Sequence, residues 1–243
     1  MFPSTRLRKV NLAAQAYESI RNLILDQDIR PGDPIGIDTL AASLGVSPTP
    51  IREALARLEG DRLVVRLDSG RYRAAPELSL KDFADLYDVR LIMEPVAAAL
   101  AARNRSDETA MRLRALVGEI ALAGRGPQSQ DFAEFVEIDR VFHLTIAEAG
   151  DNSFLASTMA QLQANLRVGP YYRGRGVIDA EVVIGEHALI CEAIASRDEA
   201  AAEAAMREHI TRARDQLLEW MAAREGAPPG RRGSPAPNRR EDA

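Results

Sequence analysis

Residues 40–64 read LAASLGVSPTPIREALARLEGDRLV, and this stretch decides the fold of the N-terminal part of the chain. Apolar residues recur at helical spacing on both sides of a short break, which predicts two helices. Gly45 lies in the break and allows a sharp turn between them. A small shared core would be formed by the apolar residues Leu40, Ala41, Leu44, Val46, Ile51 and Leu55. The stretch therefore predicts a helix-turn-helix.

Three helices are expected in this part of the chain, counting one before the motif. Residues 10–28 carry apolar side chains three and four apart and predict an amphipathic helix. Asp38 is a good N-cap for the short helix that ends at Leu44. Ser47 is expected to cap the next helix, with Pro48 at its first position, where the missing N–H of proline is harmless.

A hairpin is predicted to follow the last of these helices. Residues 63–75 read as two short strands around a turn at 68–70. Three helices and a hairpin make a winged helix-turn-helix, here residues 10–76, which binds double-stranded DNA in the proteins that carry it. The other interpretation is a small helical domain that docks another protein.

The expected DNA contacts lie at two places in this layout. The first turns of the second helix in a helix-turn-helix reach the major groove and its phosphates, and the tip of a wing reaches the minor groove or a phosphate. An arginine side chain can pair with guanine or with phosphate. The residues at these positions are Ser47, Thr49, Arg52, Gly70 and Arg71.

The rest of the chain predicts an all-α antiparallel bundle over residues 77–223. Six helices are expected, at 79–102, 106–124, 129–149, 152–167, 178–196 and 198–222, with a loop at 169–176. Residues 1–9 are expected to be flexible, and the segment 224–243, rich in proline, glycine and arginine, to be disordered. The fold class is therefore mainly α.

Composition narrows the class of protein further. The chain has 243 residues, 46% of them apolar, but no run near the roughly 18 apolar residues that cross a membrane. Its N-terminus has no apolar segment behind the basic residues, and one cysteine, Cys191, fits a reducing compartment. Residues 1–76 hold 11 basic and 9 acidic residues, whereas 77–223 hold 15 and 24. We expect a cytoplasmic protein whose N-terminal part is the better suited to nucleic acid.

All three histidines of the chain lie on apolar stripes of predicted helices. Asp139 and His143 are four residues apart and share one helix face. His187 and His209 lie 10 residues before and 12 residues after Arg197, at the turn between the last two helices. At about 1.5 Å of rise per residue, both histidines are roughly 15 to 18 Å from that turn, so they are expected to face each other.

These four residues admit three interpretations: packed core residues, a catalytic dyad, or ligands of a metal. A buried carboxylate is costly unless it is paired, and one carboxylate with three neutral imidazoles suits Zn²⁺, Ni²⁺, Mn²⁺ or Co²⁺. The metal interpretation is preferred, with zinc first. Glu186 and Glu208 directly precede two of the histidines and are expected to point elsewhere.

Residues 31–64, PGDPIGIDTLAASLGVSPTPIREALARLEGDRLV, resemble the N-terminal domain of GntR-family transcriptional regulators. The resemblance implies a dimer on a pseudo-palindromic operator, with Ser47, Thr49, Arg52 and the wing residue Gly70 in DNA-contacting positions. Two positions depart from the family pattern. Pro48 stands where many members have arginine, and Arg62 replaces a common glycine before the wing.

The second part resembles the FCD domain of the FadR-like branch of that family. The matching motifs are LYDVRLIMEPVAAALAA (86–102), DRVFHLTIAEAGDN (139–152), EHALICEAI (186–194) and AMREHITRA (205–213). The resemblance implies that Asp139, His143, His187 and His209 bind a metal inside the bundle, next to a small carboxylate effector.

Arg90 is the first candidate to hold that effector. It lies on the stripe Phe83, Leu86, Tyr87, Arg90, Met93, Ala97, and an inward guanidinium can hold a carboxylate by two hydrogen bonds. The alternative is an ion pair with Glu94, four residues later. Asn165 and Arg167 are further candidates for the effector pocket.

Together these features predict a metal-dependent, ligand-responsive transcriptional regulator that acts as a homodimer. Three rivals remain open at the level of sequence: a metal-dependent enzyme of the hydrolase type, a sensor of the metal itself, and a purely structural metal.

Overall fold

The computed structural model describes residues 12–25, 28–166, 169–172 and 175–225 of the chain. The chain divides into two compact units, of which the first runs to Leu78 and the second begins at Ser79. The predicted flexible segment 1–9 lies outside the described residues. Of the predicted disordered tail only Arg224 and Glu225 are described, as the end of the last helix.

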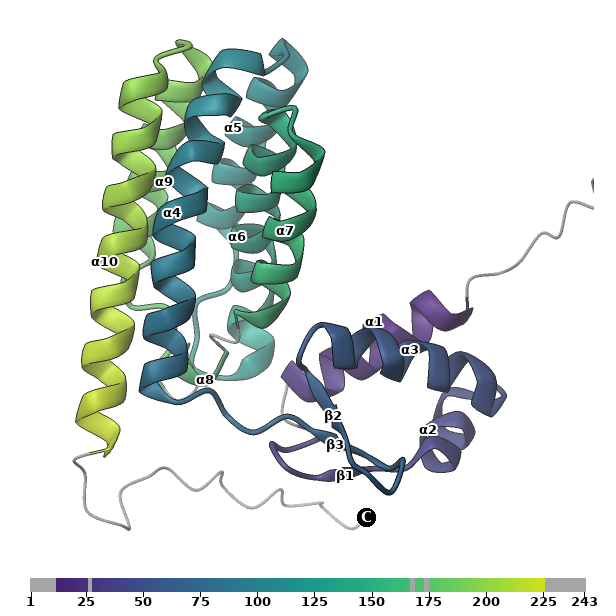
Figure 1. The fold of residues 1–243 in the computed structure, drawn as a ribbon. Coiled ribbons are helices and arrows are strands. Elements are labelled where there is room, and N and C mark those ends of the chain that lie inside the picture. Colours follow the sequence, from purple (N-terminus) through teal and green to yellow (C-terminus); the bar gives the residue numbers. More distant parts are fainter. Residues whose placement is uncertain (1–11, 26–27, 167–168, 173–174, 226–243) are drawn as a thin grey trace, which may run out of the picture. The chain divides into compact units, whose positions relative to one another are not determined.

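The first unit is a winged helix-turn-helix, as the sequence predicted (Figure 1). Its elements are α1 (Leu12–Leu25), β1 (Pro34–Ile35), α2 (Ile37–Leu44), α3 (Pro48–Gly60), β2 (Val64–Arg66) and β3 (Tyr72–Ala74). The core side chains with no exposed surface are Ile20, Ile51, Ala54, Leu55, Leu58 and Leu63. These residues come from α1, α3 and the start of the wing, and Leu40 and Ala41 of α2 belong to the same cluster, so burial of one apolar cluster holds the unit together.

The turn between α2 and α3 has the expected chemistry, with one correction. Gly45 ends α2 in the left-handed region, at φ 66°, where a residue without a Cβ is favoured. Ser47 is the N-cap of α3 and Pro48 its first residue, as predicted. Asp38 is not an N-cap, because α2 already begins at Ile37 after Gly36. The Asp38 carboxylate instead lies in the first turn of the helix, where the helix dipole favours a negative charge.

The wing has three strands rather than two. β3 lies between β1 and β2 in an antiparallel sheet, with Ile35 opposite Tyr72 and Val65 opposite Arg73. Strand β1 was missed because two residues carry no periodic signal. Its Pro34 is acceptable there, since an edge strand has a side without ladder hydrogen bonds.

The backbone conformation of Arg62 explains how an arginine can replace the glycine that is common in the family before the wing. It follows α3 with φ 55°, a left-handed conformation that favours glycine. The next amide, that of Leu63, donates to the carbonyl oxygen of Leu58 at 2.9 Å. This pattern ends the helix as a Schellman motif, so the chain enters the wing by the path that a glycine would allow.

The second unit is a helical bundle in which the long helices run side by side (Figure 1). Its elements are α4 (Leu80–Asn104), α5 (Asp107–Leu122), α6 (Ser129–Ala149), α7 (Ser153–Asn165), α8 (Gly169–Tyr172), α9 (Ala180–Ala195) and α10 (Glu199–Glu225). Helix α4 packs against α6, α9 and α10, and α9 packs against α10. The six predicted helices are present. The predicted loop at 169–176 is wrong in its first half, since α8 forms one helical turn there.

Local signals fix where the first helix of the bundle begins. Ser79 accepts a hydrogen bond from the amide of Asp82, whose carboxylate accepts one from the amide of Ser79 in return. This capping box satisfies two backbone groups that would otherwise lack a partner. None of the helices in the described part of the chain is both long and apolar enough to cross a membrane.

Candidate metal centre

Three helices of the bundle bring the four predicted ligands together. Asp139 and His143 come from α6, His187 from α9 and His209 from α10. Each offers a nitrogen or carboxylate oxygen, and these atoms all lie within 4.8 Å of one another. The three histidines are buried, whereas the side chain of Asp139 is 25% exposed. The cluster therefore has one partly open side, at the carboxylate.

The rings face one another closely. Oδ1 of Asp139 lies 3.4 Å from Nε2 of His187 and 3.9 Å from Nε2 of His143. The ring centroids of His187 and His209 are 4.8 Å apart, so these two histidines do meet across the α9–α10 hairpin. Phe142 stacks on His187 at 4.1 Å and holds that ring in place by packing.

Two glutamates lie directly behind the histidines. Oε2 of Glu94 is 2.6 Å from Nδ1 of His143, and Oε2 of Glu186 is 2.7 Å from Nδ1 of His209. Glu186 does not point away from the histidines, as the sequence suggested. It points away from its neighbour His187 but reaches across to α10. Glu208, by contrast, is exposed on the outer face of α10.

Each glutamate is itself paired with an arginine. Nε of Arg90 donates to Oε1 of Glu94 at 2.5 Å, and both side chains are buried. Arg212 donates from Nε and Nη2 to the two oxygens of Glu186. Sequence reasoning considered the pair of Arg90 and Glu94 only as an alternative to an effector role, and it missed the link from Glu94 to His143. The signal was present, because Glu94 lies on the stripe of Tyr87 and Arg90.

Burial is the main influence on the protonation of the histidines in this cluster. Burial, reinforced by His209 and His143, lowers the pKa of His187 well below its ordinary value. Burial also lowers the pKa of His209, against the opposing effect of Glu186. Burial alone would raise the pKa of Glu94, but Arg90 and His143 bring it below the usual range. His187 and His209 are therefore neutral near pH 7, as metal ligands must be.

The residues fit a divalent metal on two observations. Among the described residues, no ring nitrogen of His187 or of His143 has a partner with hydrogen-bond geometry. Buried polar atoms without a partner cost stability, and one ligand atom of each of the four residues lies within 4.8 Å of the others, where a shared metal could satisfy them. One carboxylate oxygen with three imidazole nitrogens is also a donor set that suits Zn²⁺ and its neighbours in the first transition series.

The effector candidates are only partly described. Arg90 is buried, and its guanidinium lies 4.8 Å from the ring centroid of Tyr87. The ion pair with Glu94 uses Nε, which leaves the two Nη groups outside that pair. Asn165 is the last residue of α7. Arg167 lies outside the described residues.

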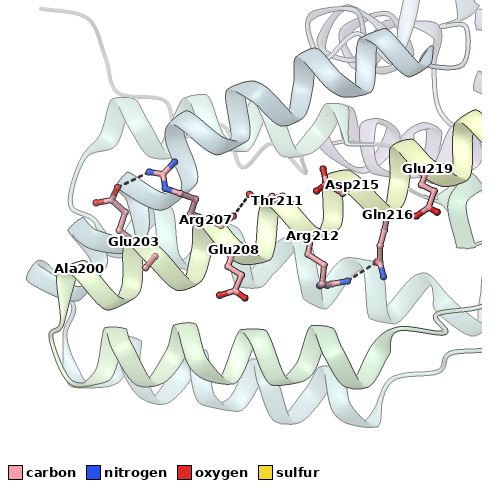
Figure 2. A pocket seen from close by; sticks show the side chains of 10 residues that line it. Ala200, Glu203, Arg207, Glu208, Thr211, Arg212, Asp215, Gln216 and Glu219 are labelled. Carbon is pink, nitrogen blue, oxygen red and sulfur yellow. Dashed lines mark hydrogen bonds and ion pairs between the residues drawn. The ribbon is translucent and has the colours of Figure 1, made fainter.

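An open groove on the outer face of α10 is a separate feature (Figure 2). Its lining is mostly charged and includes Glu203, Arg207, Glu208, Arg212 and Asp215. Arg207 and Arg212 pair there with Glu203 and Gln216, as Figure 2 shows. None of the four residues of the metal cluster lines this groove, so the groove is not part of the candidate metal centre.

The predicted DNA contacts lie on the surface of the first unit. Ser47, Thr49 and Arg52 are exposed on and before the first turns of α3, and Gly70 and Arg71 are exposed at the tip of the β2–β3 hairpin. The guanidinium of Arg52 has no partner within the described residues. Arg57 and Arg73 are engaged, over the ring of Tyr17 and with the carbonyl oxygen of Gly32.

Comparison with known families covers both units. The family described as "Bacterial regulatory proteins, gntR family" matches residues 12–73, and the FCD domain family matches residues 85–212.

Individual relatives match over most of the chain. The Uxu operon transcriptional regulator of Escherichia coli is 30% identical over 222 residues, which are 83% of this chain and 84% of that protein. The transcriptional regulator LutR of Bacillus subtilis is 28% identical over 221 residues, 80% of this chain and 96% of its own length.

Solved structures show the same fold. The structure of McbR/YncC of E. coli covers 88% of this chain and 100% of its own, with a TM-score of 0.75 and 21% sequence identity. A transcriptional regulator of Rhodococcus sp. RHA1 covers 85% of this chain and 97% of its own, with a TM-score of 0.67 and 20% identity. At these identities the likeness concerns the fold alone.

Proposed function

Because the chain belongs to the GntR family of bacterial regulatory proteins and carries an FCD domain, we propose that a divalent metal and a small organic acid in its helical unit control its binding to DNA. The family makes it a DNA-binding transcriptional regulator and not an enzyme. The observation that carries the further proposal is the convergence of four metal-ligating side chains in the buried centre of the bundle.

The first unit would read the operator through α3 and the wing. Arg52 is exposed and has no partner in the part of the chain that the structure describes, so its guanidinium can pair with a base edge or a phosphate. Further contacts to the sugar-phosphate backbone of the same half-site would come from Ser47, Thr49, Gly70 and Arg71. Two copies of the chain would place two such units on half-sites about 34 Å apart, which is one turn of DNA.

Asp139, His143, His187 and His209 would hold the metal, zinc first, with nickel, manganese or cobalt as the alternatives. When bound, the metal supplies a positive charge at the centre of the bundle, to which an anion is attracted. The partly open side of the cluster, at Asp139, is where a ligand from solvent would approach.

A small carboxylate is the effector that these residues favour. Arg90 lies one turn from Glu94 on α4, and its Nη groups lie outside the pair with Glu94. The planar guanidinium of an arginine can bind a carboxylate by two parallel hydrogen bonds. The effector acts as a switch only if it binds one arrangement of the dimer better than the other. A coupling of about 1 to 3 kcal/mol would change operator affinity by about 5- to 150-fold.

The experiment combines metal loading, a ligand screen and DNA binding. Protein stripped by chelation is reloaded with zinc and screened by thermal shift against small mono-, di- and tricarboxylates. Operator affinity is then measured by fluorescence anisotropy on a site selected from random oligonucleotides. We expect stabilisation by a carboxylate only in the zinc-loaded protein, together with a change in operator affinity.

Two other results would contradict the effector part of the proposal. Operator affinity that follows zinc concentration with no carboxylate would identify a metal sensor. Zinc that raises the melting temperature, with no change in operator affinity under any condition, would identify a structural metal.

A further inference from the structure

Two carboxylates outside the four-residue cluster lie beside Nδ1 of its histidines: Glu186 is hydrogen-bonded to His209, whereas Glu94 approaches His143 closely without hydrogen-bond geometry. Glu94 lies 2.6 Å from Nδ1 of His143, and Glu186 lies 2.7 Å from Nδ1 of His209. The two glutamates come from different helices, α4 and α9, and approach from outside the cluster. The coincidence of residue type, atom and distance at both sites calls for one explanation.

The contacts select which ring nitrogen can bind a metal. A neutral imidazole has one N–H and one nitrogen with a free lone pair, and a hydrogen bond from the N–H fixes which is which. A carboxylate next to Nδ1 favours the proton there, because it can only accept. Nε2 of His143 and of His209 is then the atom with the free lone pair, and that of His143 lies 3.9 Å from Oδ1 of Asp139.

The arginines keep this arrangement free of excess charge. Arg90 neutralises Glu94, and Arg212 neutralises Glu186. Of these three carboxylates, Asp139 is then the one without an ion pair to an arginine among the described residues. A buried ion pair is rarely stabilising in itself, so the pair of Arg90 and Glu94, 3% and 1% exposed, needs a reason other than stability.

We propose that Glu94 and Glu186 are positioning residues, which hold His143 and His209 with Nδ1 protonated and Nε2 facing the metal. The proposal rests on the proposed metal site and concerns its outer shell, whose residues in metalloproteins orient ligands and strengthen binding. His187 has no such carboxylate among the described residues. The stacking of Phe142 at 4.1 Å orients that ring instead.

Glu186→Gln is the decisive variant. Arg212 keeps its contacts with Asp179 and Gln216 when the Glu186 carboxylate is gone, so no arginine is left without a partner. Glu94→Gln is a second variant, although it removes the partner of the buried Arg90. Glu203→Gln is the matched control, because Glu203 pairs with Arg207 on α10, 45% and 51% exposed, away from any histidine.

Two measurements on the full chain test the proposal. Zinc affinity is measured by competition with a chromophoric chelator, and the tautomers of the three histidine rings by long-range proton–nitrogen NMR. We expect zinc affinity to fall by about 10- to 100-fold in Glu186→Gln and Glu94→Gln, and to stay at the wild-type value in the control. The NMR spectrum should show Nδ1–H in His143 and His209 of the wild type, and lose that tautomer at His209 in Glu186→Gln.

The outcomes separate this inference from the proposed function. Wild-type zinc affinity and an unchanged His209 tautomer in Glu186→Gln would overturn the positioning role and leave the metal site standing. A wild-type protein that takes up no zinc would overturn both.

Discussion

Cys191 is a single-site probe of the helical unit, and its alkylation should be very slow in the folded protein. The side chain is 5% exposed on α9, one helical turn after His187. Burial raises the pKa of the Cys191 thiol from its ordinary value of 9.0 to about 12. At pH 8 the reactive thiolate is then about one molecule in ten thousand rather than about one in ten, a loss of about 1000-fold in rate before access is considered.

The pH dependence has a defined sign. The folded state favours the neutral thiol of Cys191. The contribution of this preference to the free energy of unfolding is therefore complete below pH 9 and is lost as pH rises towards 12. Alkylation should therefore accelerate across that interval. Zinc should slow the alkylation further, because a metal ion bound by His187 stabilises the same turn of α9 against opening.

The assay is a timed pulse of iodoacetamide, quenched and measured by mass spectrometry, with the chain unfolded in urea as the reference. Since the chain has one cysteine, the mass change reports one site. Alkylation of the folded protein at pH 8 within about tenfold of the unfolded rate would refute the reasoning from burial. Equal rates with and without zinc would refute the coupling to His187.

Three other predictions concern the first unit. Arg52→Ala should weaken operator binding by about 1 to 3 kcal/mol in an anisotropy titration while the bundle keeps its melting temperature, and unchanged affinity would remove Arg52 from the contacts. Leu55→Ala should cost about 2 to 5 kcal/mol, because Leu55 is fully buried in that unit. It should abolish operator binding yet leave zinc uptake intact; loss of both would contradict the independence of the two units. Arg62→Gly should stabilise the unit by about 0.5 to 1 kcal/mol in urea unfolding, since it relieves the left-handed conformation at φ 55°. A lower free energy of unfolding in Arg62→Gly would show that the contacts of the arginine side chain stabilise the unit by more than the backbone strain destabilises it.

Much of the fold could be predicted because its helices carry strong periodic signals. The helix-turn-helix and the six helices of the bundle follow from apolar spacing, caps and turn residues. Strand β1 escaped because two residues show no alternation. The N-cap of α2 was misplaced because Gly36 caps through its extended backbone and offers no side chain to recognise.

The site was predictable only where its residues break a pattern. A histidine or an aspartate on an apolar stripe is unexpected, and the spacing across one hairpin placed His187 opposite His209. Glu186 gave no such signal, because its role depends on reaching a neighbouring helix, which no spacing along α9 encodes. Glu94 shared the stripe of Arg90, and the ion pair between them was a sufficient explanation until His143 was found beside it.

Whether the four side chains bind a metal can be read from the metal content of the purified protein. Wild-type protein and His187→Ala are dialysed against zinc, freed of loose ions by gel filtration, and measured by elemental analysis. The ring nitrogens of His187 have no hydrogen-bond partner among the described residues, so the substitution removes a ligand without breaking a hydrogen bond to a charged group. We expect about one zinc ion per chain in the wild type and much less in the variant. No zinc in the wild type, or a full ion in His187→Ala, would contradict this expectation.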